Sequence, residues 1–416
     1  MTSVLVADSK YQFVPPHEGE LWPRILARLT PHFLKRRHGI IKIEVRGSEA
    51  IRKLQASGHG IVLAPNHSRM SDAIVLQSLS RQLNQPFFVM ASSHLFRGSR
   101  SLAWLLRKLG AFSVYREGID RQAVQKGIDI LVEGRRPLVL FPEGALSQAN
   151  DHLNQLQEGV SFIARSAAAK LEKASAESSS LSPRRVFTVP VAIRYVYQGD
   201  IEVTAGAMLS SIEKRLSWQP QEGQCLVERI YRVGNALLSL KEQEYLGQSH
   251  TGELDDRLTR LINHLLAPLE SEWLGGTKEG AVILRVKELR RAILPAMIDG
   301  NLAPAELDRR WKHLKTASFA QSLSLYPARY VASKPTAERI LETVERFNEH
   351  LNGDETVHGP MKAIIQVGEP IEVSPKRDRS SKVDALLQSV EQQLKQLLEV
   401  TATDCSMYAR RTLQRD

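Results

Sequence analysis

Residues 60–83 read GIVLAPNHSRMSDAIVLQSLSRQL and contain the pattern that decides the fold. The apolar run Gly60–Ala64 predicts a buried strand, and the apolar positions of Ala73–Leu83 recur at helical spacing. A strand followed closely by a helix is the unit from which α/β domains with parallel sheets are built. The polar residues from Asn66 to Asp72 therefore lie where a strand ends and a helix begins, which is where open α/β sheets bind ligands.

The same alternation of strands and helices extends from Ile40 to about Gly206. Further strands are predicted at residues 87–90, 111–115, 137–141 and 186–193, with a helix at 121–133. From Met208 to Leu351 the spacing stays helical, and a strand signal returns only at Ala363–Val367, before a final amphipathic helix. A lone strand cannot satisfy its backbone, so we expect this one to complete the first sheet. No internal repeat is evident.

The predicted fold class is thus α/β, a mainly parallel sheet with flanking helices that is interrupted by a helical insertion. We divide the chain into an N-terminal amphipathic segment for membrane contact (1–39), an α/β domain (40–206), a helical insertion (207–360), and a closing strand with a C-terminal helix (361–416).

Composition narrows the classes of function. The 416 residues include 56 Lys and Arg against 46 Asp and Glu, and the net charge of +10 favours polyanionic surroundings. Aromatic residues are only 6% and are not interleaved with basic ones, so we expect no nucleic-acid partner. The two cysteines, Cys225 and Cys405, lie far apart, and no apolar run reaches the roughly 20 residues of a membrane span. We therefore expect a cytoplasmic protein that is neither exported nor integral to a membrane.

His67 and Asp72 are the first candidates for chemistry. On a regular helix, residues five apart point to different sides, so the two meet only if a loop joins them. Asp72 would then fix one imidazole tautomer and leave the other ring nitrogen to take a proton from a hydroxyl. Because no serine nucleophile accompanies them, the attacking group would come from the substrate. The alternative stays open that Asp72 caps the helix and His67 is an ordinary loop residue.

Three more stretches place polar or special residues at strand ends. Arg116 follows the strand at 111–115, Glu143 and Gly144 follow the strand at 137–141, and Pro190 lies within the strand at 186–193. In a parallel sheet such ends gather on one edge. Taken singly, each has an ordinary explanation, namely a surface arginine, a tight turn and an edge-strand proline.

In order, the segments NHSRMSD, GAFSVYR, FPEG and VPVAI resemble the four blocks of the glycerolipid acyltransferase family, which includes the 1-acylglycerol-3-phosphate acyltransferases. The resemblance covers about Ile40–Gly206, and Gly368–Ile371 is similar to the family's closing strand. The helical insertion resembles nothing in the family. The fold that the resemblance implies is the acyltransferase-like α/β fold.

The resemblance also implies a role for each block. His67 is implied as the general base on an acceptor hydroxyl and Asp72 as its orienting carboxylate, with acyl-CoA or acyl-carrier protein as the thioester donor. The implied substrate contacts are Asn66, Arg116 at the acceptor's phosphate, Glu143 and Gly144 at the acceptor pocket, and Pro190 at the acyl chain or thioester. No cofactor and no metal site are expected, because the histidines show no paired spacing.

The expected activity is O-acyl transfer to 1-acylglycerol-3-phosphate or a related lysophospholipid, in phospholipid synthesis. Many family members continue the third block with Thr-Arg-Ser, but here Gly144 is followed by Ala145-Leu146-Ser147, which lacks the second arginine. Other acceptors therefore stay open, namely glycerol 3-phosphate, another lysolipid or diacylglycerol. So does a non-catalytic lipid-binding protein with the same fold.

The segment Glu20–Arg46 has the composition of an amphipathic interfacial helix, with leucines, a tryptophan and several basic residues. It predicts peripheral contact with an anionic membrane surface. A helix that packs on the core with a solvated basic face is the equal alternative. Val282–Met297 is a second basic candidate for such contact.

Overall fold

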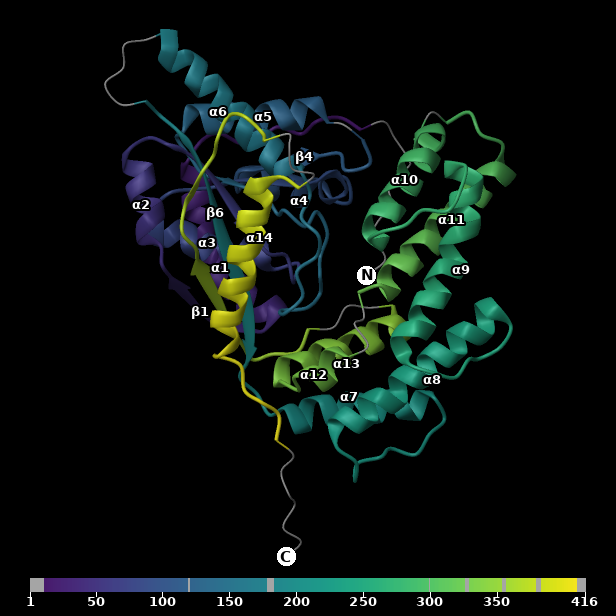
Figure 1. Cartoon of the computed structure of the whole chain (residues 1–416). Helices are drawn as coiled ribbons and strands as arrows, with labels where there is room; N and C mark the ends of the chain where they lie inside the picture. Colours follow the sequence, from purple (N-terminus) through teal and green to yellow (C-terminus); the bar gives the residue numbers. More distant parts are fainter. Residues whose placement is uncertain are drawn as a thin grey trace, which may run out of the picture. The chain divides into compact units, whose positions relative to one another are not determined.

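The computed structural model divides into two compact units, each described here by itself (Figure 1). The α/β unit comprises Tyr11–Gln198 and Gly359–Cys405, and the helical unit comprises Gly199–His358 and the chain from Ser406. The structure describes residues 11–118, 120–177, 183–298, 300–325, 329–353, 357–378 and 383–409. Residues 1–10 of the expected N-terminal segment lie outside these ranges.

The α/β unit is built on an eight-stranded sheet with the order β1-β7-β6-β2-β5-β3-β4, and β8 pairs with β6 beside this path. The strands are β1 (Ile40–Arg46), β2 (Gly60–Pro65), β3 (Phe88–Ser92), β4 (Ala111–Val114), β5 (Leu138–Val139), β6 (Val186–Tyr197), β7 (Met361–Val367) and β8 (Ile371–Glu372). The five adjacent strands β6, β2, β5, β3 and β4 run parallel to one another. The strand β7 is antiparallel to β6. The mainly parallel sheet and the late closing strand are thereby confirmed.

Helices cover both faces of this sheet. One face carries α5 (Arg121–Glu133), α6 (Gly159–Glu177) and α14 (Ala385–Ala402), which share an apolar core with the strands (Figure 1). The other face carries α1 (Leu21–His38), α2 (Glu49–Ala56) and α3 (Asp72–Leu83). The 3-10 turn η1 (Ser93–Phe96) and α4 (Arg100–Lys108) connect β3 to β4. Each crossover between parallel strands thus returns through a helix, as such sheets require.

The helical unit is inserted in the chain between β6 and β7, two strands that a short turn could otherwise connect. These strands are antiparallel neighbours, with Tyr197 opposite Met361, and the backbone N–H of Gln198 donates to the carbonyl of Pro360 at 2.8 Å. The first helix already begins at Ile201, because Asp200 accepts from two backbone N–H groups and caps it. Helical structure therefore begins a few residues before the expected boundary at 207.

Seven helices of the described chain form this unit. They are α7 (Ile201–Arg215), α8 (Leu226–Leu246), α9 (Leu254–Leu274), α10 (Val282–Ile298), α11 (Pro304–Leu323), α12 (Tyr330–Ser333) and α13 (Ala337–Asn352). Two apolar clusters hold them together, one among α9, α10 and α11 and the other among α7, α8 and α13. The helical spacing predicted from Met208 to Leu351 is confirmed by these helices.

A buried ion pair recurs between successive helices of this unit. In each case an arginine near the start of one helix binds a fully buried glutamate near the end of the preceding helix, and a backbone N–H eight residues beyond the glutamate donates to the same carboxylate. The three sets are Arg229, Glu213 and Gln221; Arg257, Glu242 and His250; and Arg285, Glu270 and Lys278. The arginines are spaced 28 residues apart. The expectation that the chain has no internal repeat was wrong.

Candidate active site

The candidate residues follow neighbouring parallel strands. His67 lies two residues after β2, Arg116 two residues after β4, and Glu143 a few residues after β5. Because these strands are parallel, their carboxyl ends meet on one edge of the sheet. The sequence prediction that these segments share an edge is confirmed.

A loop brings His67 and Asp72 together. The strand β2 ends at Pro65 and α3 begins at Asp72, and between them the chain turns so that His67 Nδ1 lies 2.9 Å from Asp72 Oδ2. Asp72 is fully buried, and the histidine side chain is 21% exposed. The imidazole also stacks on Phe141, with ring centroids 4.0 Å apart. Orientation by a carboxylate on one side and an aromatic ring on its face leaves Nε2 as the nitrogen for proton transfer.

The Asp72 carboxylate has two further donors. Its Oδ2 accepts the backbone N–H of Arg69 at 2.9 Å, and its Oδ1 accepts the phenol of Tyr195 at 2.5 Å. Tyr195 lies on β6, and sequence reasoning missed it because it is 123 residues away. Burial, followed by the charge of Asp72, raises the pKa of Tyr195 well above its usual value. The phenol therefore stays protonated and remains a donor to the carboxylate.

Glu143 is fully buried, and its side chain holds the loop between β2 and α3 that carries His67. One carboxylate oxygen accepts the backbone N–H of His67 at 2.6 Å, and the other accepts that of Asn154 at 2.8 Å. Burial raises the pKa of Glu143 to about 8, against the lowering effect of these two bonds. The structure thus gives this residue a role in holding His67, while its contact with an acceptor stays a prediction.

Arg116 meets the turn that follows β5. Its guanidinium Nη1 donates to the carbonyl of Gly144 at 2.6 Å. Gly144 has φ of +66°, a left-handed conformation that favours glycine. Burial lowers the pKa of Arg116 from its usual value, and burial together with the Arg116 charge lowers the pKa of His94 to about 4. A cationic arginine and a neutral imidazole therefore lie at this end of the sheet edge.

Two asparagines extend the sheet beyond the end of β2. The amide of Asn66 bonds to both backbone groups of Ile193, with Nδ2 to oxygen at 3.1 Å and nitrogen to Oδ1 at 2.7 Å. The amide of Asn150 does the same with Tyr195, at 2.8 and 2.9 Å. Both side chains thus replace a strand beside β6. For Asn66 this is a structural contact, and its predicted substrate contact stays a prediction.

Pro190 lies inside the sheet. The ladder from β8 to β6 ends at Thr188, and the ladder from β7 begins at Val191, so a proline without an N–H fits in the gap between them. Its carbonyl accepts the N–H of Gly368 at 2.8 Å. The alternative that Pro190 marks an edge strand is wrong, because β6 pairs on both sides. Its contact with an acyl chain or thioester stays a prediction.

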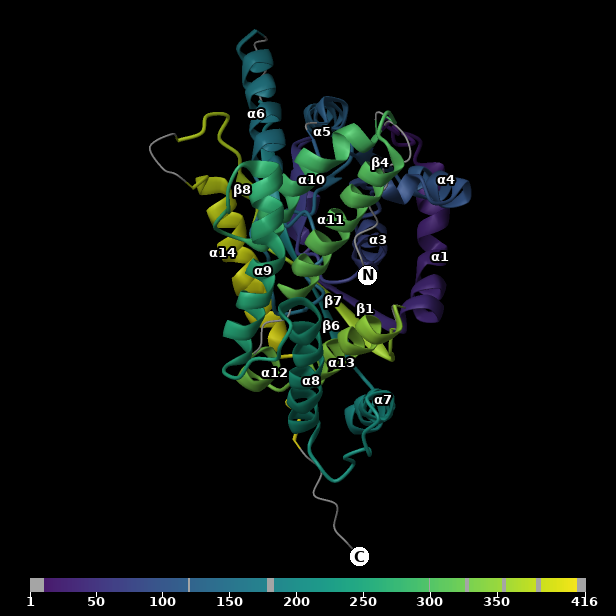
Figure 2. The ribbon, with the colours of Figure 1, turned by 90° about the vertical axis from the view of Figure 1, so that its right-hand side faces the viewer.

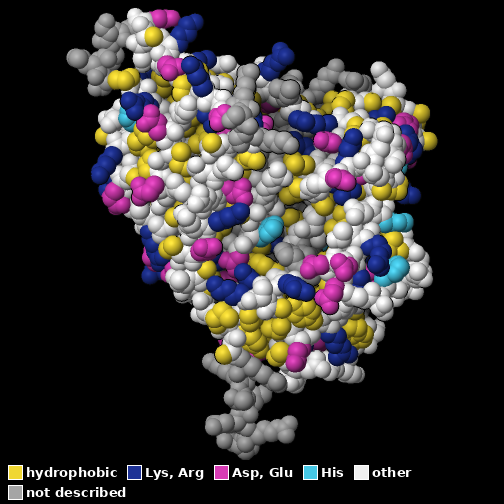
Figure 3. Space-filling view, in the orientation of Figure 1, with side chains coloured by type: hydrophobic (Ala, Val, Ile, Leu, Met, Phe, Trp, Pro, Cys, Tyr) yellow, Lys and Arg dark blue, Asp and Glu magenta, His cyan; other side chains and the backbone are white. Residues whose placement is uncertain are grey.

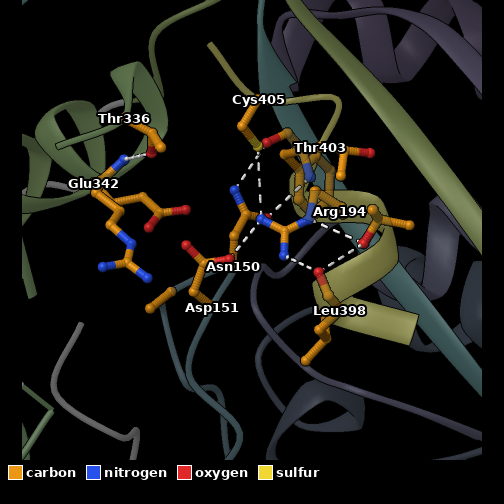
Figure 4. A network of polar contacts seen from close by, with 12 residues as sticks. Asn150, Asp151, Arg194, Thr336, Glu342, Leu398, Thr403 and Cys405 are labelled. Carbon is orange, nitrogen blue, oxygen red and sulfur yellow. Dashed lines mark hydrogen bonds and ion pairs between the residues drawn. The ribbon is translucent and has the colours of Figure 1, made fainter. Parts of the chain in front are cut away.

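The loop after Gly144 ties this site to the C-terminal helix. Ser147 donates its backbone N–H to the carbonyl of His67 at 2.7 Å, and Asp151 pairs with the buried Arg194 at 2.6 Å. The Arg194 guanidinium also donates to the Leu398 carbonyl of α14 at 2.6 Å (Figure 4). The loop, β6 and α14 are therefore joined around one buried cation.

The described residues gather no three His, Cys, Asp or Glu side chains in the manner of a metal site. Nor does any helix among them combine the length and the apolarity that crossing a bilayer requires. The polar groups at the sheet edge are an imidazole, two carboxyl groups and a guanidinium, which suit proton transfer and anion binding.

Comparison with known proteins agrees with this geometry. A family model described as Acyltransferase matches residues 42–194, which contain every candidate site residue. The chain is also similar to a 1-acyl-sn-glycerol-3-phosphate acyltransferase of Streptococcus pneumoniae (strain ATCC BAA-255 / R6), with 26% identity over 119 residues. Those residues are 29% of this chain, and the match spans 42% of the relative's length.

Proposed function

Because residues 42–194 belong to the glycerolipid acyltransferase family, we propose that the protein moves a fatty acyl group from acyl-CoA or acyl-carrier protein to the hydroxyl of 1-acylglycerol-3-phosphate or a related lysolipid. The observation that carries this proposal is the contact between His67 Nδ1 and Asp72 Oδ2 at a sheet edge. An imidazole oriented in this way is suited to activate a hydroxyl.

In the proposed reaction, His67 Nε2 takes the proton of the acceptor hydroxyl as the oxygen attacks the thioester carbonyl. Collapse of the tetrahedral intermediate breaks the carbon–sulfur bond and expels the thiolate, which takes the proton back from the imidazolium. The products are an ester and a free thiol, and no acyl-enzyme forms. Asp72 stabilises the imidazolium while it exists.

Arg116 is the proposed contact for the acceptor's phosphate, because a guanidinium suits a phosphate and this one lies on the same sheet edge as His67. Glycerol 3-phosphate, another lysolipid and diacylglycerol remain alternative acceptors. A non-catalytic lipid-binding protein is the alternative of another class. The paired His67 and Asp72 favour an enzyme, since a protein that only binds lipid has no use for an oriented base.

We further propose that the protein works in the cytoplasm as a peripheral protein of an anionic membrane. The supporting observation is a surface formed by α1 and α4, which we call the tryptophan surface; its apolar members are Leu21, Trp22, Ile25, Leu29, Phe33, Leu102 and Trp104, all exposed. The helices α1 and α4 lie next to each other (Figure 2). Trp22 packs edge-to-face on Trp104, and Lys108 lies over both rings. Such a basic and apolar surface suits a bilayer interface.

The opposite face of α1 packs on the α/β unit through its smaller side chains and Leu34. Most of its other large apolar residues point outward, with Leu21 69% and Leu29 62% exposed, which disfavours the core-packing alternative. The second candidate, Val282–Met297, corresponds to α10. There Arg285 is buried in an ion pair with Glu270, so α10 is less suited to lipid contact.

The test incubates the purified protein with a panel of lysolipids and glycerol 3-phosphate, with acyl-CoA or acyl-carrier protein, and identifies the products by mass. His67→Ala should lower transfer by about 10² to 10⁴ fold, the usual cost of losing a general base. His264→Ala, an exposed histidine on α9, is the matched control and should retain full activity. Arg116→Ala should raise KM for phosphorylated acceptors more than KM for the donor.

Two outcomes would overturn the proposal. Near-parental turnover by a folded His67→Ala protein would remove the mechanism, and a parent that acylates no acceptor in the panel would favour the non-catalytic alternative. Equal acceptor constants in the parent and in Arg116→Ala would show that the arginine does not bind the phosphate.

A further inference from the structure

The two oxygens of the Asp72 carboxylate have different partners. Oδ2 faces His67 and accepts the N–H of Arg69, while Oδ1 accepts the phenol of Tyr195 at 2.5 Å. The Asp72 side chain has no exposed surface. A buried carboxylate depends on its donors to keep its charge, and a short bond from a phenol is among the stronger donors available.

Tyr195 is itself held rigidly. Its backbone N–H and carbonyl are both bonded to the Asn150 amide, and its hydroxyl also lies 2.9 Å from Ser71 Oγ. The Arg69 guanidinium lies over its ring, 5.3 Å from the centroid. The adjacent residue of β6, Arg194, projects to the opposite face and is anchored to α14 (Figure 4). Asn150 therefore fixes the backbone of Tyr195, while Ser71 and Arg69 hold its side chain beside Asp72.

From this geometry we propose that Tyr195 is a positioning residue for Asp72, and that its hydrogen bond limits how tightly the His67–Asp72 pair holds a proton. The inference rests on the proposed function, in which His67 must be a free base before it can act. The bond to Oδ1 stabilises the carboxylate charge from the side away from His67. It thereby fixes the carboxylate plane and makes the carboxylate a weaker base toward the imidazole.

Other titratable and charged groups also face this pair. Glu143 binds the backbone N–H of His67, and Arg69 lies over the Tyr195 ring, so both contribute to the field at the imidazole. The hydroxyl bond to Oδ1 comes from Tyr195. Removing only the hydroxyl of Tyr195 leaves these two groups in place, so that substitution isolates its contribution.

The decisive measurement is the titration of His67 by NMR in the full-length protein labelled at the histidine Cε1 carbon, with His67→Ala used to assign the signal. In Tyr195→Phe the titration midpoint should move to higher pH by about one unit, from the loss of one charge-assisted hydrogen bond. Tyr197→Phe makes the same change two residues along β6 and should leave the midpoint in place. Replacing Tyr195 with 3-fluorotyrosine keeps the shape, gives a stronger donor, and should move the midpoint to lower pH.

A midpoint that stays in place in both Tyr195 variants overturns the proposal, and so does an equal shift in Tyr197→Phe. If Tyr195→Phe fails to fold, the 3-fluorotyrosine protein decides alone. In an acyl-transfer assay, kcat of Tyr195→Phe at neutral pH should fall about tenfold with both KM values unchanged, and the acidic limb of its pH profile should follow the NMR midpoint. The NMR result needs no turnover, so absent acyl transfer in the parent would count against the proposed function and not against Tyr195.

Discussion

Glu143 shows how burial couples one residue to pH. Its pKa is raised from about 4.5 to about 8 by burial. Between these values the folded protein holds a proton at this site that the unfolded chain has lost. The stability that this group contributes is therefore fully present below about pH 4.5 and decreases as pH rises through 8.

We predict that Glu143→Gln removes this dependence. The free energy of unfolding of the variant should be about 1–3 kcal/mol lower than that of the parent, because its amide cannot accept from both backbone N–H groups. This difference should become smaller as pH rises from about 4.5 to 8. Urea unfolding of the parent and the variant across this range measures it. Glu172→Gln, at an exposed position of α6, should follow the parent at every pH. A constant difference between parent and Glu143→Gln would mean that Glu143 keeps its usual titration.

The sequence predicts some contacts between individual residues and misses others. The spacing of His67 and Asp72 at a strand end predicts that they meet if a loop joins them, and they do. Tyr195 and Asn150 could not be found in this way, because their partners lie on strands and loops distant in the chain. A tyrosine in an apolar strand gives no sign of which carboxylate it will reach.

The contribution of the buried ion pairs between helices of the helical unit to stability can be tested directly. Arg257→Met should leave Glu242 as an unpaired buried carboxylate and cost about 3–5 kcal/mol. Arg260→Met, three residues along the same helix and exposed, should change stability by no more than about 0.5 kcal/mol. Urea unfolding, with hydrogen exchange of α8 and α9, gives both values.

The double variant Arg257→Met with Glu242→Leu should recover much of the loss, because no charge is then buried. If Arg257→Met is as stable as Arg260→Met, the pair contributes nothing and the apolar clusters alone hold the helices. Partial recovery in the double variant would instead measure how well the two apolar side chains fill the space.

The repeated ion pairs are accompanied by a repeated sequence that helical periodicity does not reveal. Residues 235–247 read NALLSLKEQEYLG and residues 263–275 read NHLLAPLESEWLG, which share their asparagine, two leucines, two glutamates and closing Leu-Gly. Helical periodicity alone predicted the helices but not their repetition, because it does not distinguish a paired glutamate from a solvated one. Of the predicted strands, β5 is shorter than its apolar run and β6 continues beyond 193 to Tyr197, and the strand β1 was not predicted.

In the molecule as a whole, the net positive charge lies in the α/β unit. Residues 11–198 and 359–405 contain 32 Lys and Arg against 21 Asp and Glu, whereas residues 199–358 contain 20 against 23. Basic and acidic side chains are interspersed over the face drawn in Figure 3. The excess of basic residues therefore lies in the α/β unit, which also carries the tryptophan surface. Attraction to anionic lipid would require this arrangement.

We predict that changing Arg28, Lys35, Arg36 and Arg37 to Glu releases the protein from anionic vesicles, since each basic residue near the surface contributes about 1 kcal/mol. Parental binding should weaken as salt rises. Trp104→Ala should weaken binding in a manner that salt does not change, because it removes apolar contact. Sedimentation with vesicles that contain or lack acidic lipid measures each effect.

The matched control places the same charge change elsewhere. Reversing Lys214, Arg215, Lys312 and Lys315, all exposed on the helical unit, alters net charge by the same amount and should leave vesicle binding near that of the parent. Equal release by both quadruple variants would mean that net charge, rather than the surface on α1 and α4, governs binding.

The join between β6 and β7 also sets the order of assembly during synthesis. A ribosome that adds roughly 5–20 residues per second releases β7 some ten to thirty seconds after β6, because about 160 residues separate them. An unstructured tether of that length makes strand pairing entropically costly. The helical unit folds from local contacts, and its ends are one hydrogen bond apart at Gln198 and Pro360. Once folded, it brings β7 close to the edge of β6, which lacks its β7 partner for those ten to thirty seconds.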